Sequence, residues 1–257
     1  MFDPHVYGKL DLAGAHRIAS ATNSLLIAMQ EYAEGVMEQS DDAAKLGCKG
    51  IEMSDAVLDL AQLLGSCGAF SKQKYLSELL IYSAAIADRC EVCALTHIDS
   101  AVRARVPETL IDSVQAIGLY IHAQADDDTY MLFDAYIRHW QRFEEWPHLS
   151  RNQILNLKFY NLIALLMSMV VRKQRLVRFH AHELLTRSNV RPEEILEIIG
   201  VAQVMGGLPA RWEAIHILDV ASELHENGLL PDAFVSVLNG MPGSMKKNTA
   251  SSDHSNV

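Results

Sequence analysis

The sequence predicts an all-α protein, and three observations support this prediction. Apolar residues recur at three- and four-residue spacing along nearly the whole chain, which is the helical period. Glycine (14) and proline (7) are scarce among the 257 residues, and β-branched runs between turns are rare. The longest apolar run, residues 162–171, is interrupted by Ser168 and is too short to cross a membrane. We therefore expect a soluble fold of ten or eleven helices.

The helices of the first half follow one another with recognisable ends. They are predicted over residues 10–38, 54–64, 72–89, 90–105, 107–123 and 129–143. Ser54 is a good N-cap, and Pro107 suits a first helical turn because its missing N–H has no intrahelical partner there. Three aspartates, residues 126–128, precede the last of these helices, where acidic side chains complement the helix dipole.

The second half of the chain repeats this pattern weakly. An offset of 83 residues places Leu79 on Leu162, Arg89 on Arg172 and His97 on His180. The offset then becomes 85, where VPETLI aligns with RPEEIL. Both halves show a helix, a polar break, a helix with a histidine, a proline and a further helix in the same order. We interpret the chain as two tandem degenerate repeats.

This repeat divides the chain into four parts. Residues 71–147 form a first repeat that contains a C-x-x-C motif, and residues 148–240 form a degenerate second repeat without cysteines. Residues 1–70 are a helical N-terminal extension. Residues 241–257 are small and polar without an apolar period, which predicts a disordered tail.

Charge and cysteine usage restrict the partners and the compartment. The chain has 22 basic and 32 acidic side chains and a net charge of −10, which argues against binding to nucleic acid or to an anionic membrane. The N-terminus lacks the apolar region of a secretory signal, so we expect a cytoplasmic, reducing environment. The four cysteines are therefore not a disulfide framework.

Cys90, Cys93 and His97 form the constellation that carries chemistry. At 100° per residue, these three residues share one face of a helix, with the imidazole one turn after Cys93. A histidine there can take the thiol proton, and a helix N-terminus adds thiolate character. Residues three apart can also close a disulfide. The motif is thus a candidate dithiol/disulfide switch.

Two other interpretations of this motif compete with the redox one. A zinc site would need a fourth ligand, and the sequence has no second C-x-x-C or H-x₃₋₅-H to supply it. A pair of buried core cysteines is the second alternative, because free cysteine is often buried. We expect no metal and no cofactor.

Glu78 extends the motif to E-x₁₁-C-x₂-C-x₃-H within ELLIYSAAIADRCEVCALTH. This string resembles the active-site motif of alkylhydroperoxidase D, in the carboxymuconolactone decarboxylase-like superfamily. The resemblance covers about Leu76 to His122. Residues 190–215 resemble the acidic helix and Gly-Gly-x-Pro turn of the same superfamily.

The resemblance implies a role for each site residue. Cys93 would be the buried thiol that attacks a hydroperoxide, and Cys90 the more exposed partner that closes the disulfide. Glu78 and His97 would form a proton relay with water. The best-known members have a histidine where this chain has Val92. The implied reductant is a lipoylated or thioredoxin-like dithiol protein, and the implied assembly is a homo-oligomer, a trimer or a hexamer.

The implied relay makes a demand on the backbone. On one straight helix Glu78 would lie about 18 Å from Cys90, so the relay needs a break near residues 87–89. Asp88 is a reasonable N-cap for the second helix.

The leading prediction is therefore a thiol-dependent peroxidase. The alternatives are a lyase of the carboxymuconolactone decarboxylase type, with His97 as acid and base, and a non-catalytic helical scaffold for interaction or stress signalling.

Other residues received structural interpretations. His180 and His182 point about 200° apart on a helix and cannot share an ion. Cys48 and Cys67 have no histidine at helical spacing, and we interpret them as buried thiols. An aromatic cluster of Trp140, Phe143 and Trp146 indicates a core or subunit interface.

Overall fold

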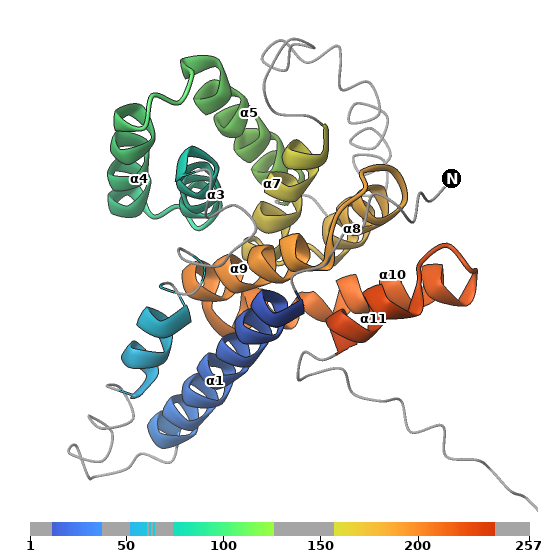
Figure 1. Cartoon of the computed structure of the whole chain (residues 1–257). Helices are drawn as coiled ribbons and strands as arrows, with labels where there is room; N and C mark the ends of the chain where they lie inside the picture. Colours follow the sequence, from blue (N-terminus) through green and yellow to red (C-terminus); the bar gives the residue numbers. More distant parts are fainter. Residues whose placement is uncertain are drawn as a thin grey trace, which may run out of the picture.

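A computed structural model describes residues 12–37, 52–60, 62, 64, 74–125 and 157–239. The helices are α1 (Leu12–Met37), α3 (Lys74–Ala87), α4 (Glu91–Arg103), α5 (Glu108–Ala125), α7 (Leu157–Val170), α8 (Gln174–Arg187), α9 (Pro192–Trp212), α10 (Ala214–Glu226) and α11 (Asp232–Asn239). Residues 52–60 are also helical. Across these ranges the chain forms helices and turns without a strand, which confirms the predicted all-α fold (Figure 1).

The helix ends follow local sequence signals. α5 begins directly after Pro107, as predicted. α9 begins at Pro192, and the carboxylate of Glu194 accepts a hydrogen bond from the backbone N–H of Arg191 at 2.8 Å. The helix expected to start at Ser54 is already helical at residue 52, a difference that is common where a helix end frays.

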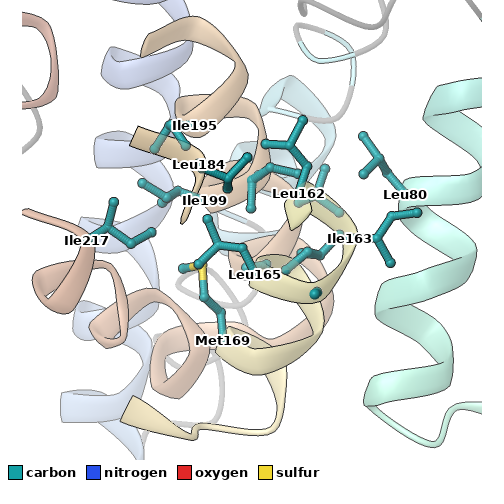
Figure 2. Packing of buried hydrophobic residues seen from close by; sticks show 14 of the residues in the cluster. Leu80, Leu162, Ile163, Leu165, Met169, Leu184, Ile195, Ile199 and Ile217 are labelled. Atoms are coloured by element: carbon teal, nitrogen blue, oxygen red, sulfur yellow. The ribbon is translucent and has the colours of Figure 1, made fainter. Parts of the chain in front are cut away.

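Two central helices, α7 and α9, hold the fold together. α7 packs against α3, α5, α8 and α9, and residues 161–170 of α7 are all buried. The apolar run noted in the sequence is therefore the core helix. Figure 2 shows Leu162, Ile163 and Leu165 of this helix between Leu80 of α3 and Leu184 of α8. Among the helices of the described ranges, none has the length and hydropathy that a bilayer crossing requires.

The N-terminal part packs on the second half of the chain. α1 lies against α9 (Figure 1), and the Gln203 side chain donates a hydrogen bond to the carbonyl of Thr22 at 3.1 Å. Gly200 of α9 allows the Leu64 side chain to approach this helix closely, because a Cβ at residue 200 would lie 3.3 Å from Leu64. The helices before residue 70 thus share the hydrophobic core, while the four-part domain division stays a prediction.

The segments α3–α4–α5 and α7–α8–α9 have matching turns. Arg89 and Arg172 both adopt left-handed backbone conformations, with φ of 57° and 59°. The N–H of Cys90 bonds to the carbonyl of Ala85, and the N–H of Lys173 bonds to that of Ser168, both at 3.0 Å. The offset of 83 residues therefore relates equivalent backbone hydrogen bonds. A common origin of the two units stays a prediction.

Candidate functional site

The turn between α3 and α4 sets up the site. α3 ends at Ala87, and the left-handed Arg89 redirects the chain so that α4 packs beside α3 (Figure 1). This is the break that the relay requires. The N-cap predicted at Asp88 is wrong, because Cys90 holds that position and Asp88 lies in the turn. The turn takes up two residues after α3, so the N-cap is Cys90 and the first helical residue of α4 is Glu91.

Cys90 and Cys93 lie together at the start of α4. Cys90 is the N-cap residue, with φ −83° and ψ 94°, and Cys93 is the third residue of the helix. Both are free thiols of intermediate burial, and their sulfur atoms are hydrogen-bonded at 2.7 Å. This pair has the arrangement that a C-x-x-C disulfide switch needs, because a small movement of the two Sγ atoms would bring them to bonding distance.

The pKa of the second cysteine is raised by its surroundings. The hydrogen bond with Cys90 is the largest cause of a raised pKa for the Cys93 thiol, followed by desolvation and by the negative charges of Cys90 and Asp88. Placement at a helix N-terminus does not overcome these effects, since the pKa of Cys93 is raised on balance. An attack by Cys93 therefore needs a base to remove the thiol proton.

Glu78 and His97 form the second half of the site. The Oε2 atom of Glu78, on α3, lies 2.9 Å from Nδ1 of His97, on α4, and both side chains are mostly buried. The carboxylate accepts the hydrogen bond, so Nδ1 of His97 carries a hydrogen, and the other ring nitrogen, Nε2, is left for a second partner. The structure thus brings together the two residues that the motif predicts as a relay.

The two pairs are neighbours without a direct link. Cys93 and His97 lie one turn apart on the same face of α4, and no hydrogen bond joins them among the residues described. A proton could pass between them through a water molecule or through a substrate oxygen.

The equivalent position in the second unit has lost this chemistry. His180 lies 3.0 Å from Oδ1 of Asn161, which replaces the glutamate, and Lys173 and Leu176 replace the cysteines. His180 is fully buried, and desolvation lowers its pKa to about 3. An imidazole that stays neutral, beside an amide, is poorly suited to proton transfer.

The other residues that the sequence singled out either lie as predicted or fall outside the described residues. His180 is buried and His182 is exposed, as expected for side chains on opposite sides of one helix. The interpretations of Cys48 and Cys67, of residues 126–128, of the cluster Trp140, Phe143 and Trp146, and of the tail at 241–257 lie outside the described residues.

An apolar cavity of about 270 Å³ opens beside His97. It is lined by Leu64, Ser77, Leu80, Ile81, His97, Glu197, Val201, Val204 and Met205. Neither cysteine contributes to the lining. Glu197 and its neighbours on α9 were not predicted as site residues, although a glutamate within the apolar run of that helix could have indicated them. A larger groove of about 810 Å³ lies between α1 and residues 52–62, and the described residues that line it include no cysteine or histidine.

The comparison with protein families gives one match. Residues 140–220 match the carboxymuconolactone decarboxylase family, a range that contains α7, α8 and α9 and ends within α10. No curated protein and no solved structure matches the chain. The match lies on the unit without cysteines, so it is independent of the C-x-x-C motif. Residues 140–220 are therefore similar to the carboxymuconolactone decarboxylase family, within the alkylhydroperoxidase D-like superfamily.

Proposed function

We propose that this protein is a thiol-dependent peroxidase that reduces hydroperoxides through Cys90 and Cys93. The superfamily includes peroxidases and decarboxylases. The observation that carries the proposal is the meeting, at the start of α4, of a hydrogen-bonded thiol pair and a Glu78–His97 pair. Two thiols and a buried acid–imidazole pair supply the nucleophile, the resolving group and the proton carrier that this reaction needs.

The reaction balances with these groups and one external reductant. The Cys93 thiolate attacks the terminal peroxide oxygen, the O–O bond breaks, and the products are a sulfenic acid on Cys93 and, after proton transfer, an alcohol. The Cys90 thiol then attacks the sulfenic sulfur and releases water, which leaves a Cys90–Cys93 disulfide. A dithiol reductant returns both cysteines to thiols and becomes a disulfide itself.

The Glu78–His97 pair would supply the base that Cys93 needs because the pKa of this thiol is raised. Nε2 of His97 takes the thiol proton, directly after a small movement or through water, and the imidazolium that forms is stabilised by Glu78. The same proton then passes to the leaving alkoxide. Val92, which replaces a histidine of the best-known members, is 76% exposed and adds no proton carrier. The chain therefore depends on one imidazole.

The surface around the motif suits a protein reductant. Val92 and Leu95 are exposed large apolar side chains on α4, on either side of Cys93, and only Ala101 of this helix is buried. A lipoylated or thioredoxin-like dithiol protein would reach the disulfide across this surface. The trimer or hexamer implied by the resemblance belongs to the same proposal, since a second copy could cover other parts of α4.

The family description also favours a second candidate, a lyase of the carboxymuconolactone decarboxylase type. His97 lines the cavity whereas the cysteines do not, which is the arrangement that acid–base chemistry without thiols would use. An acidic lactone, however, needs basic side chains to balance its charge, and none lines this cavity. We therefore prefer the peroxidase.

A dithiol-coupled peroxide-consumption assay tests the proposal. Cys93→Ser and Cys90→Ser should each abolish turnover, and free-thiol titration of the parent should show two thiols lost on exposure to peroxide. The Cys48→Ser/Cys67→Ser double variant is the matched control and should keep the parent rate. Turnover by Cys93→Ser at the parent rate would exclude the peroxidase. Decarboxylation of a lactone acid by the Cys90→Ser/Cys93→Ser variant would establish the lyase, and inactivity in both assays would favour the scaffold.

A further inference from the structure

The groove between α1 and residues 52–62 is formed by one face of each of two helical segments, which lie side by side (Figure 1). On α1 the lining residues recur every three or four positions from Arg17 to Ala28, which corresponds to ~17 Å of helix. On the other wall they recur in the same way from Glu52 to Gln62, over ~15 Å. The groove, of about 810 Å³, is therefore long enough for about three turns of a further helix.

Short side chains line this groove on the α1 side. Ser20 and Ser24 are exposed, and Ala21 and Ala28 are half-buried, as is Ala56 on the opposite wall. The distance between two packed helix axes is set by the side chains at the contact and can be as small as ~8 Å. A third helix could therefore approach both segments closely.

The two walls suit a helix better than an extended peptide. The lining residues of α1 lie inside a helix of 26 residues, so their backbone N–H and C=O groups are bonded along that helix. An extended peptide would find no strand edge to pair with, and its covered backbone groups would lack partners. A helix satisfies its own backbone hydrogen bonds and needs only side-chain contacts.

One wall carries three carboxylates and no counter-charge. Glu52, Asp55 and Asp59 follow one another at three- and four-residue spacing, and all three are exposed. Across the described parts of the chain, none of them forms an ion pair, and Arg17 is the one basic residue among those that line the groove. Like charges one turn apart on a helix repel each other, and a row of basic side chains placed opposite them would relieve this repulsion.

We propose that the groove binds a basic amphipathic helix of a partner protein. Lysine or arginine side chains, one per turn over about three turns, face Glu52, Asp55 and Asp59, and small side chains pack against Ser24 and Ala28. The groove shares no lining residue with the cavity beside His97 and does not use the thiols. This docking surface therefore goes beyond the proposed peroxidase, and the partner binds in either redox state.

Fluorescence anisotropy with the full-length protein tests the proposal. The probe is a labelled peptide of about 15 residues, built from alanine and leucine with lysines at three- and four-residue spacing on one face. A peptide of the same composition with the lysines spread around the helix is the control. We expect the amphipathic peptide to bind at least 10-fold more tightly, with an affinity that falls as salt is added. Equal affinities would indicate unspecific attraction to an acidic protein and would overturn the proposal.

Paired substitutions locate the peptide. Asp55→Lys/Asp59→Lys should weaken binding at least 10-fold, whereas Glu108→Lys/Glu226→Lys makes the same change in net charge at exposed positions outside the groove and should leave binding unchanged. Equal losses in the two folded double variants, or parent affinity in the first, would contradict the assignment.

A bulky side chain tests the shape of the groove. Ser24→Trp should block the peptide because it fills the space beside α1, and Leu119→Trp, at an exposed position on α5, should not. Parent affinity in folded Ser24→Trp would overturn the docking site.

A segment of this chain is the competing occupant, since its C-terminal part contains Lys246 and Lys247. Absence of peptide binding by the full-length parent would overturn the proposal. Binding that appears only in Lys246→Ser/Lys247→Ser would assign the groove to the chain's own C-terminal residues and would also overturn the partner helix.

Discussion

Acid should destabilise this protein through His180. The residue is fully buried, and its pKa falls from the ordinary value of 6.5 to about 3 in the folded state. Below pH 6.5 this imidazole therefore binds a proton in the unfolded chain and not in the folded chain, so the free energy of unfolding falls as the pH drops. Over the whole window from pH 6.5 to 3 the loss is about 5 kcal/mol, at 1.36 kcal/mol per pH unit.

A measurable part of this loss in the free energy of unfolding falls between pH 7 and 5. Between pH 7 and 5 the same two pKa values correspond to a loss of about 2 kcal/mol. Urea unfolding of the parent and of His180→Gln at both pH values measures it, because the variant lacks the buried imidazole and should lose about 2 kcal/mol less than the parent. Comparing the pH dependence rather than the absolute stability removes the cost of the substitution itself.

His182 provides the matched control. It lies on the same helix with its side chain exposed, so His182→Gln should show the pH dependence of the parent. Equal losses in the parent and in His180→Gln would refute the reasoning. So would a nuclear magnetic resonance titration in which His180 protonates near pH 6.5 in the folded protein.

Three further predictions concern the thiol site and the packing around it. Cys90→Ala should lower the pKa of Cys93, because it removes the largest cause of the raised value, and the pH dependence of alkylation by iodoacetamide measures this. An unchanged profile would contradict the hydrogen bond with Cys90 as that cause. Glu78→Gln replaces the carboxylate that bonds to His97, so peroxide turnover should fall about 100-fold and its pH profile should shift, while thermal stability should change little. A change in KM alone would argue against a proton relay. Gly118→Ala should lower the free energy of unfolding by about 1–3 kcal/mol in urea, because the new Cβ would lie 2.6 Å from the Ile86 side chain. A gain in stability would mean that the higher helix propensity of alanine outweighs this clash.

Most of the site could be predicted because it depends on local spacing. Cys90, Cys93 and His97 lie on one face of one helix, and three- and four-residue spacing determines that face. The break between Glu78 and Cys90 followed from the relay that the resemblance implies together with the helical distance, since no straight helix could bring the glutamate to the imidazole. The N-cap was misplaced at Asp88 because a left-handed turn residue such as Arg89 is not evident from composition.

The protonation states could not be predicted in the same way. Helical spacing indicates that a histidine follows Cys93, but the raised pKa of that thiol arises from a sulfur–sulfur contact of 2.7 Å and from burial. His97 and His180 occupy equivalent positions, yet only His180 is fully buried. Burial depends on how many neighbours pack around a residue, which is a property of the tertiary structure.

By itself, the sequence determined the helical fold and the shared helix face of Cys90, Cys93 and His97, because periodicity and spacing are local properties of the chain, and Glu78 followed from the superfamily resemblance. Only the tertiary structure decided that Glu197 and Val204, which are far from His97 along the chain, line a cavity with that imidazole. The reason is physical: a cavity exists where side chains of separate helices fail to fill the space between them, and this depends on the packing of α3 against α9.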